Sequence, residues 1–352
     1  MTHHRGRRAL GVLLPVAGLL TLALPVDPTP SAAAVAAVGT ATTTATSAST
    51  TIIGSTGSTE STESTGSTGS TGCHRSASVP LPVAPGRTGT LSLNQGTVTG
   101  TYDLTVPPTY KKNRPAPLIF LFHGDGDNPG DFSAKTNFPV QGARAGNLVV
   151  VPQNQGPEVG FQYSGHGTDA TFVNSLINAL MRSYCVNQRA VFTSGFSSGA
   201  AFAILYACAH QSQIRAIATV AVDYQLGCTR PEPLLALHGT ADPAVTYQNN
   251  TIGSQLPGIK LDANSVKGTV RNMADWVKLD RCRPTTPTVT RVGSQVSRSQ
   301  WLSCAPGTSV TFYTISGGGH EWPGAKVTTG VGFTTQQISA NTLIINFFHS
   351  FT

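Results

Sequence analysis

Charged residues are scarce in this sequence and make up only 11% of its 352 residues. Glycine is abundant instead, with 37 residues, and serine and threonine are common as well. A balance of this kind is more typical of exported proteins than of cytosolic ones. The length suits one large domain or two small ones and does not by itself decide between them.

The sequence lacks an extended run of Lys and Arg that would mark a nucleic-acid-binding surface. Its formal net charge is +7, and this value falls to about +5 once residues 1–36 are removed. A basic patch is the electrostatic footprint of nucleic-acid binding, so a role on nucleic acid has little support. The high pI then implies mild affinity for cell walls or polysaccharide at most.

No apolar run reaches the roughly 20 residues that a membrane-spanning helix needs. The apolar run at residues 9–24 follows Arg5, Arg7 and Arg8, and small residues follow it. This order is that of a secretory signal peptide. We therefore expect a signal peptide over residues 1–36, cut within residues 32–37, and a secreted protein without a membrane anchor. An uncleaved anchor is the alternative.

Large apolar side chains are nearly absent from the next segment, residues 37–72, which repeats Gly-Ser-Thr and Glu-Ser-Thr triplets. Such a segment buries too little surface to offset the entropy cost of ordering. We expect a disordered linker there, either an O-glycosylated stalk or an undecorated spacer.

Metal-binding cysteine patterns are also missing, because no Cys-x-x-Cys pair or His-linked cysteine pattern occurs. This absence argues against a zinc site. An even number of cysteines in an exported chain predicts three disulfides, with 15 connectivities open. The six cysteines are Cys73, Cys185, Cys208, Cys228, Cys282 and Cys304.

What the sequence does contain, from residue 73 to residue 352, is the pattern of one packed α/β domain. Short apolar runs at residues 117–124, 147–153, 190–195, 214–222 and 233–239 end in turn residues. Nearly continuous apolar runs predict strands that are covered on both faces, as in a parallel sheet. Helical patterns with apolar spacing lie between and after them, and Thr168 is the expected N-cap of the first. The alternation predicts a doubly wound α/β fold with active groups at the carboxyl ends of the strands.

The stretch AVFTSGFSSGA places a G-x-S-x-G motif between an expected strand and an expected helix. In that position the motif is a nucleophile elbow, in which glycines allow the tight turn that exposes a serine hydroxyl. Only Ser197 fits the frame. The motif alone is weak in a sequence so rich in glycine and serine, but its placement favours Ser197 as the nucleophile.

A nucleophilic serine needs a histidine base and a carboxylate that orients it, and α/β hydrolases carry them in the order Ser, Asp or Glu, His. Asp242 follows an expected strand in HGTADP, and His320 lies in the glycine-rich loop GGGHEWPG. An Asx turn at Asp242 and a surface-loop histidine at His320 are the structural alternatives. The order and placement of the three residues favour a catalytic triad.

Two backbone N–H groups are predicted to stabilise the oxyanion that forms on the attacked carbonyl. One belongs to Ser198 at the start of a helix, and the other to Asp125 in the glycine-rich loop FHGDGDNPG. His123 and His238 each end an expected strand, and we interpret both as structural because no further metal ligands are spaced around them. We expect neither a metal nor an organic cofactor.

Several segments together make the chain resemble secreted feruloyl esterases of the carbohydrate esterase type, especially the fungal ones. The matching segments, in chain order over residues 73–352, are RPAPLIFLFHG, SYCVNQRAVFTSGFSSGA, HGTADPAVTY, MADWVKLDRC and GGGHEWPG. The resemblance implies an α/β-hydrolase fold with a mainly parallel central sheet, and it matches Ser197, Asp242 and His320 to the family's triad. It also implies that Cys73 pairs with Cys185, Cys208 with Cys228, and Cys282 with Cys304.

The chain departs from the family near the expected substrate cleft. Ser198-Gly199-Ala200 stands where an Asn-Gly pair often follows the nucleophile, and Phe161 and Tyr163 stand where a tryptophan is usual. These departures leave the acyl and sugar preference open. Phe161, Tyr163 and Trp322 are the expected substrate contacts, Trp322 by stacking on an aromatic acyl group or, alternatively, by packing its own loop.

The leading hypothesis is thus a monomeric serine esterase that releases ferulate or related hydroxycinnamates from plant cell wall polysaccharide such as arabinoxylan. A short-chain esterase that acts on acetylxylan or polyhydroxybutyrate is the enzymatic alternative, and a non-catalytic wall-binding protein is the alternative from another class. Asn249 begins a glycosylation sequon, Asn-Asn-Thr.

Overall fold

A computed structural model describes residues 68–76, 78–156, 159–248 and 268–352. The expected signal peptide, most of the expected linker and Asn249 lie outside these residues. None of the helices in the described ranges is long and apolar enough to span a membrane.

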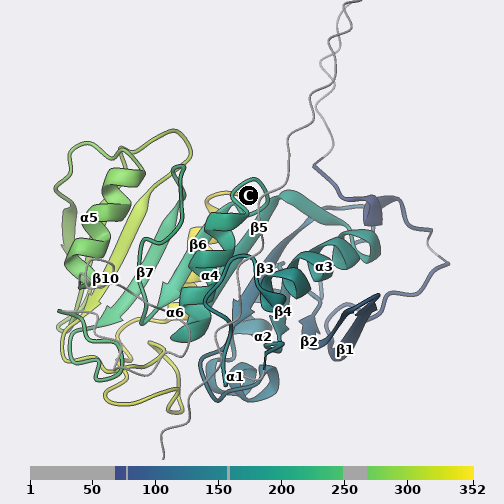
Figure 1. Cartoon of the computed structure of the whole chain (residues 1–352), viewed down its shortest axis with the longest axis horizontal. Helices are drawn as coiled ribbons and strands as arrows, with labels where there is room; N and C mark the ends of the chain where they lie inside the picture. The colour runs from purple at the N-terminus through teal and green to yellow at the C-terminus, as the bar shows by residue number, and fades with distance from the viewer. Residues whose placement is uncertain (1–67, 77, 157–158, 249–267) are drawn as a thin grey trace, which may run out of the picture. The chain divides into compact units, whose positions relative to one another are not determined.

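One twisted sheet of ten strands organises the domain (Figure 1). The strand order is β1-β2-β4-β3-β5-β6-β7-β10-β9-β8. The strands from β4 to β10 in this order run parallel, and antiparallel strands flank them on each side. The parallel strands are β4 (Leu148–Pro152), β3 (Ala116–Phe122), β5 (Val186–Phe196), β6 (Ala216–Val220), β7 (Leu234–Gly239) and β10 (Val310–Ile315).

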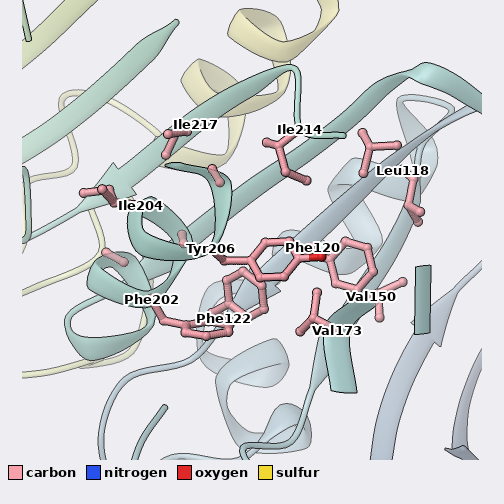
Figure 2. Close-up of a cluster of buried hydrophobic side chains, with 14 of the residues drawn as sticks. Leu118, Phe120, Phe122, Val150, Val173, Phe202, Ile204, Tyr206, Ile214 and Ile217 are labelled. Atoms are coloured by element: carbon pink, nitrogen blue, oxygen red, sulfur yellow. The ribbon is translucent and has the colours of Figure 1, made fainter. Parts of the chain in front are cut away.

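The central parallel strands are largely buried because helices cover both faces of the sheet. Phe120 and Phe122 of β3 point into a core with the helices α3 (Thr168–Ser183), α4 (Ser198–Ala209) and α5 (Thr269–Leu279). Part of this core is drawn in Figure 2. The alternate residues Ile119 and Leu121 join a second core with α1 (Pro129–Thr136), α2 (Phe138–Arg144) and α6 (Ala340–His349). The architecture is the predicted α/β-hydrolase type.

The antiparallel strands differ from the central ones in burial. They are β1 (Thr88–Gln95), β2 (Val98–Thr105), β8 (Thr288–Arg291) and β9 (Val296–Trp301). All four residues of β8 are exposed, and β1 carries mainly Thr, Ser and Asn on its outer side. An edge hairpin of this kind has one face in water and needs no continuous apolar run.

The folded domain begins earlier than the composition indicated. The N–H of Ser70 donates to Val186 O at 2.9 Å, and its hydroxyl donates to Tyr184 O. Gly69 forms a β-bridge with Asn187, and the short helix η1 (Thr71–His74) follows. Residues 68–72, placed in the linker by their Ser, Thr and Gly content, therefore pack on the start of β5.

Three disulfides tie loops to this framework, and their pairing is the one that the family resemblance implies. Cys73 bonds to Cys185, Cys208 to Cys228 and Cys282 to Cys304. At the start of α3 the expected cap is displaced by one residue. Gly167 is the N-cap, and Thr168 is already helical.

Candidate active site

Ser197 occupies a sharp turn between β5 and α4. Its backbone has φ 54° and ψ −126°, a left-handed φ that is strained for a residue with a side chain. Its carbonyl accepts the first helical hydrogen bonds, from the N–H groups of Ala200 and Ala201. This geometry is that of a nucleophile elbow.

The glycines of the motif are required by close backbone packing. A Cβ on Gly199 would collide with the carbonyl oxygens of Phe122 and His123, and one on Gly195 would collide with the Gly199 carbonyl. The elbow thus lies tightly against the end of β3. The G-x-S-x-G spacing is a steric condition for bringing the helix this close to the sheet.

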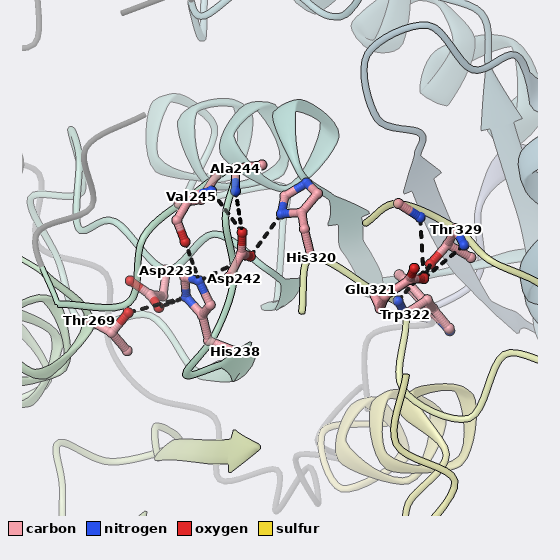
Figure 3. Close-up of polar contacts among 11 residues, drawn as sticks. Asp223, His238, Asp242, Ala244, Val245, Thr269, His320, Glu321, Trp322 and Thr329 are labelled. Carbon is pink, nitrogen blue, oxygen red and sulfur yellow. Dashed lines mark hydrogen bonds and ion pairs between the residues drawn. The ribbon is translucent and has the colours of Figure 1, made fainter. Parts of the chain in front are cut away.

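Asp242 and His320 lie side by side after neighbouring strands, Asp242 after β7 and His320 after β10 (Figure 3). His320 Nδ1 donates to Asp242 Oδ2 at 2.8 Å. The other carboxylate oxygen, Oδ1, accepts from the backbone N–H groups of Ala244 at 2.9 Å and Val245 at 2.8 Å. Burial raises the pKa of Asp242, but the hydrogen bonds from His238 and His320 outweigh it and hold this pKa well below its usual range.

His320 also lies next to the serine elbow. Its ring packs against Phe196, the residue before Ser197, with the ring centroids 4.8 Å apart. The structure therefore brings Ser197, Asp242 and His320, predicted from three separate loops, to one edge of the sheet. With Nδ1 engaged by Asp242, the Nε2 atom of His320 is the one that remains for a serine hydroxyl.

A strap of backbone, residues 329–331, holds His320 in place. His320 and Val331 form a two-way backbone bridge, with N···O distances of 2.8 and 3.0 Å. The buried Glu321 carboxylate accepts from the N–H and hydroxyl of Thr329 and from the N–H of Gly330. No motif or periodicity in residues 321–330 predicts this contact.

The loop after β3 lies against the elbow from the other side. A Cβ on Gly124 would come within 3.3 Å of Ser197 Cβ, so the backbone that leads to Asp125 lies close to the serine. Ser198 is the first residue of α4, and its N–H has no acceptor within the helix. These positions suit two N–H donors to a developing oxyanion.

Two of the expected substrate contacts are not available to a substrate in this structure. Trp322 is 1% exposed and packs edge-on against Phe132 and Phe138. Phe161 is 2% exposed and stacks on Phe202 in the core. Each ring contributes to packing beneath the site, which for Trp322 is the structural alternative stated above.

Tyr163, the third residue expected to contact the substrate, lies near the site and is half-buried. Burial and the nearby charge of Asp125 raise the pKa of its phenol, and the Ser198 hydroxyl opposes them. Gly160, three residues before it, lies so close to Asp125 that a Cβ there would collide with the Asp125 carboxylate. Tyr163 therefore neighbours both expected oxyanion residues.

A second buried histidine lies behind Asp242, in contact with an aspartate that the sequence analysis did not select. His238 Nδ1 lies 2.7 Å from Asp223 Oδ2. Asp223 follows β6, and its position directly after an apolar strand was the signal that could have found it. No cluster of His, Cys, Asp and Glu in the described ranges is arranged to hold a metal ion.

Similar proteins are known, although no protein-family model matches the chain. Feruloyl esterase D of Neurospora crassa is 25% identical over 62% of this chain and 73% of its own length. A probable feruloyl esterase C of Aspergillus flavus is 28% identical over 42% of the chain and 56% of its own length. The putative esterase NocK of Nocardia uniformis is 25% identical over 66% of the chain and 73% of its own. The chain thus spans about three quarters of the first and third proteins and little more than half of the second.

Among solved structures, an acetyl xylan esterase from Aspergillus awamori matches with a TM-score of 0.47 at 12% identity, over 66% of this chain and 94% of that one. The S954A mutant of the feruloyl esterase module from Clostridium thermocellum, complexed with sinapinate, matches with a TM-score of 0.43 at 14% identity, over 67% and 82%. Both are distant likenesses. The sheet topology, the serine elbow and the sequence relatives place the chain among the serine carboxylic ester hydrolases of the α/β-hydrolase type, where its named relatives include fungal feruloyl esterases.

Proposed function

We propose that the protein is a secreted esterase that releases ferulate or a related hydroxycinnamate from plant cell wall polysaccharide, with Ser197, His320 and Asp242 as its catalytic triad. The observation that carries the proposal is the pair of His320 and Asp242, 2.8 Å apart, beside a serine elbow. The names of the relatives supply the substrate class. The three disulfides agree with an oxidising compartment.

In the first half of the proposed reaction, His320 Nε2 takes the proton of the Ser197 hydroxyl as the oxygen attacks the ester carbonyl. Asp242 holds the ring by its Nδ1–H and stabilises the imidazolium. The N–H groups of Ser198 and Asp125 donate to the oxyanion of the tetrahedral intermediate. The imidazolium then gives its proton to the leaving alcohol, and an acyl group remains on Ser197.

In the second half, His320 takes a proton from a water molecule that attacks the acyl-enzyme. The same N–H groups stabilise the second oxyanion. The carboxylic acid leaves as Ser197 regains its proton from His320. Each proton taken is returned, so the cycle balances with the protein's own groups.

A second candidate is a short-chain esterase that acts on acetylated xylan. The observation that favours it is the burial of Trp322 and Phe161, because neither ring is free to stack on an aromatic acyl group. Of the three aromatic residues expected to contact the substrate, Tyr163 is the one that is partly exposed. An acetyl group needs no such ring.

A panel of esters separates the candidates. The full chain and its Ser197→Ala variant are incubated with methyl ferulate, methyl p-coumarate, acetylated xylan and polyhydroxybutyrate, and the released acids are measured. Release of hydroxycinnamate by the wild type, lost in Ser197→Ala, supports the proposal. Acetate release without hydroxycinnamate favours the second candidate. No acid released by either protein would indicate the non-catalytic class, and equal release by both would mean that Ser197 is not the nucleophile.

A further inference from the structure

His238 lies fully buried between two carboxylates, one on each side of its ring. Nδ1 is 2.7 Å from Asp223 Oδ2, and Nε2 is 3.4 Å from Asp242 Oδ2. Nε2 is also 2.9 Å from the carbonyl oxygen of Val245. Carboxylate and carbonyl oxygens can only accept hydrogen bonds. Both ring nitrogens therefore carry hydrogen, and the ring is a cation.

The surroundings fix this arrangement from several elements. Asn272 of α5 donates to Asp223 Oδ1 at 2.6 Å, and Trp276 donates to the Asp223 carbonyl at 3.1 Å. Thr269 contacts His238 Nδ1 at 3.1 Å, and the Tyr247 ring lies edge-on at 5.7 Å. Asp223, Asp242 and Tyr247 are thus the titratable groups that face His238 within the described ranges. Tyr247 is uncharged over the range concerned, because burial raises the pKa of its phenol.

Electrostatics agrees with the geometry. Burial alone lowers the pKa of His238, but the charge and hydrogen bond of Asp223, together with Asp242, raise it to about 10. A buried charge is stable only when it is paired and hydrogen-bonded, and this ring has an acceptor at each nitrogen. The pairing with Asp223 and Asp242 therefore favours the protonated ring.

The two histidines share one oxygen. His320 Nδ1 lies 2.8 Å from Asp242 Oδ2, and His238 Nε2 lies 3.4 Å from the same atom (Figure 3). A positive ring behind Asp242 offsets part of the field by which its negative charge favours a proton on His320.

We infer that His238, held as a cation by Asp223, is a positioning residue that adjusts Asp242 and thereby extends ester hydrolysis toward acidic pH. The inference rests on the proposed roles of Ser197, Asp242 and His320. His238 touches no reacting atom and acts only through the Asp242 carboxylate.

The main test is the pH dependence of kcat/KM for His238→Gln in the full chain, with methyl ferulate or acetylated xylan, whichever the wild type cleaves. Loss of the cation leaves more net negative charge beside His320. We expect the midpoint of the acidic limb to rise by about one pH unit, which is about tenfold in relative activity well below the midpoint. The double variant Asp223→Asn/His238→Gln removes a charge of each sign, so its limb should rise by the same amount or less.

A control variant separates this effect from loss of stability. Ile344→Ala empties space in the core on the opposite face of the sheet and touches no part of this network. We expect it to lower Tm and to leave the acidic limb at the wild-type pH. The inference would be overturned if the acidic limb of the His238→Gln pH profile coincided with that of the wild type. In that case only Tm or the maximal kcat/KM would be lowered.

A direct measurement does not depend on activity. In the Ser197→Ala protein with isotope-labelled histidine, the ring signals that disappear in Ser197→Ala/His238→Gln belong to His238. Both ring nitrogens should remain protonated from pH 5 to pH 9, and a ring that loses a proton near its ordinary pKa would refute the inference. Failure of the proposed function has another signature, because ester cleavage would then persist in Ser197→Ala.

Discussion

Trp322 donates its indole N–H to Asn341 Oδ1 at 2.8 Å, and Asn341 in turn donates to Thr136 O at 2.8 Å. This chain of bonds joins the loop after His320 to helices α1 and α6. Trp322 is therefore held by both packing and polar contacts, two residues after His320.

Trp322→Phe should lower stability and leave substrate affinity largely unchanged. The smaller ring leaves the buried Asn341 oxygen without its donor, which costs about 1–3 kcal/mol. The free energy of unfolding from denaturant titration, with KM for the preferred ester, measures both effects. A raised KM with unchanged stability would instead support stacking of Trp322 on the acyl group.

Gly199→Ala should abolish activity because the added methyl group collides with the carbonyl oxygens of Phe122 and His123. The helix must move away from the sheet, and the elbow is displaced with it. Gly130→Ala is the matched control, since Gly130 lies in helix α1 with its nearest atom, Asn128 Oδ1, at 3.5 Å. Comparable activity of the two variants would show that the elbow tolerates the shift.

Ser197→Ala should lose nearly all activity, whereas Ser198→Ala should retain most of it. Ser198 contributes its backbone N–H in the proposed mechanism, and alanine keeps that group. Initial rates with a saturating ester compare the two variants, and equal Tm values show that both are folded. An inactive Ser198→Ala with an active Ser197→Ala would mean that the wrong serine was placed in the elbow frame.

Asp242→Asn should reduce kcat by about 10⁴ with little change in KM, as expected when the carboxylate of a triad becomes an amide. The amide oxygen still accepts from the Ala244 and Val245 N–H groups, so the loop keeps its shape. The amide nitrogen then faces His320 Nδ1 and disfavours the tautomer that the mechanism needs. A loss of less than about tenfold would argue that another group orients His320.

Stability should fall as pH rises from about 5 to about 8, because of a buried acid pair away from the site. Burial raises the pKa of Glu232 to about 8 and that of Asp280 to about 7. Both folded-state values lie above the unfolded ones, so the folded protein keeps protons that the unfolded chain releases. Their stabilising effect is complete below the unfolded pKa and is lost as pH passes the folded one, at up to about 1.4 kcal/mol per pH unit for each group.

Glu232→Gln isolates this contribution. The amide is neutral at every pH, so the variant should show a flatter dependence of unfolding free energy on pH and should exceed the wild type in stability at pH 8. Asp280→Asn should act in the same direction, since its Oδ1 can still accept from the Glu232 N–H. Parallel curves for the wild type and Glu232→Gln would contradict the assignment.

Sequence reasoning found the parts of the molecule whose chemistry is local. Several buried parallel strands are short apolar runs, such as Leu148–Pro152, and the elbow glycines have a fixed spacing. The edge strands were missed because they alternate polar residues with half-buried ones and resemble loops. Residues 68–72 were missed for a similar reason, since they are held by backbone hydrogen bonds that leave no mark on composition.

In the site, too, local motifs predict some residues, whereas other contacts arise only from packing. Ser197, Asp242 and His320 follow from motif order, but the partnership of Asp223 with His238 does not. It depends on how β6, β7 and α5 meet, which only three-dimensional packing determines. The burial of Trp322 and Phe161 could not be predicted either. The sequence around an aromatic residue near a motif does not indicate whether its ring faces a cleft or the core.

Strand β5 carries the Ser70 and Cys185 attachment at its beginning and Ser197 just past its end. Its 11 residues separate these two points by roughly 35 Å. Material fused ahead of Thr68 is therefore joined to the end of this strand remote from the serine. A handle fused directly to Thr68 would therefore fix the domain to a bead or a fibre by the end of β5 that is remote from Ser197.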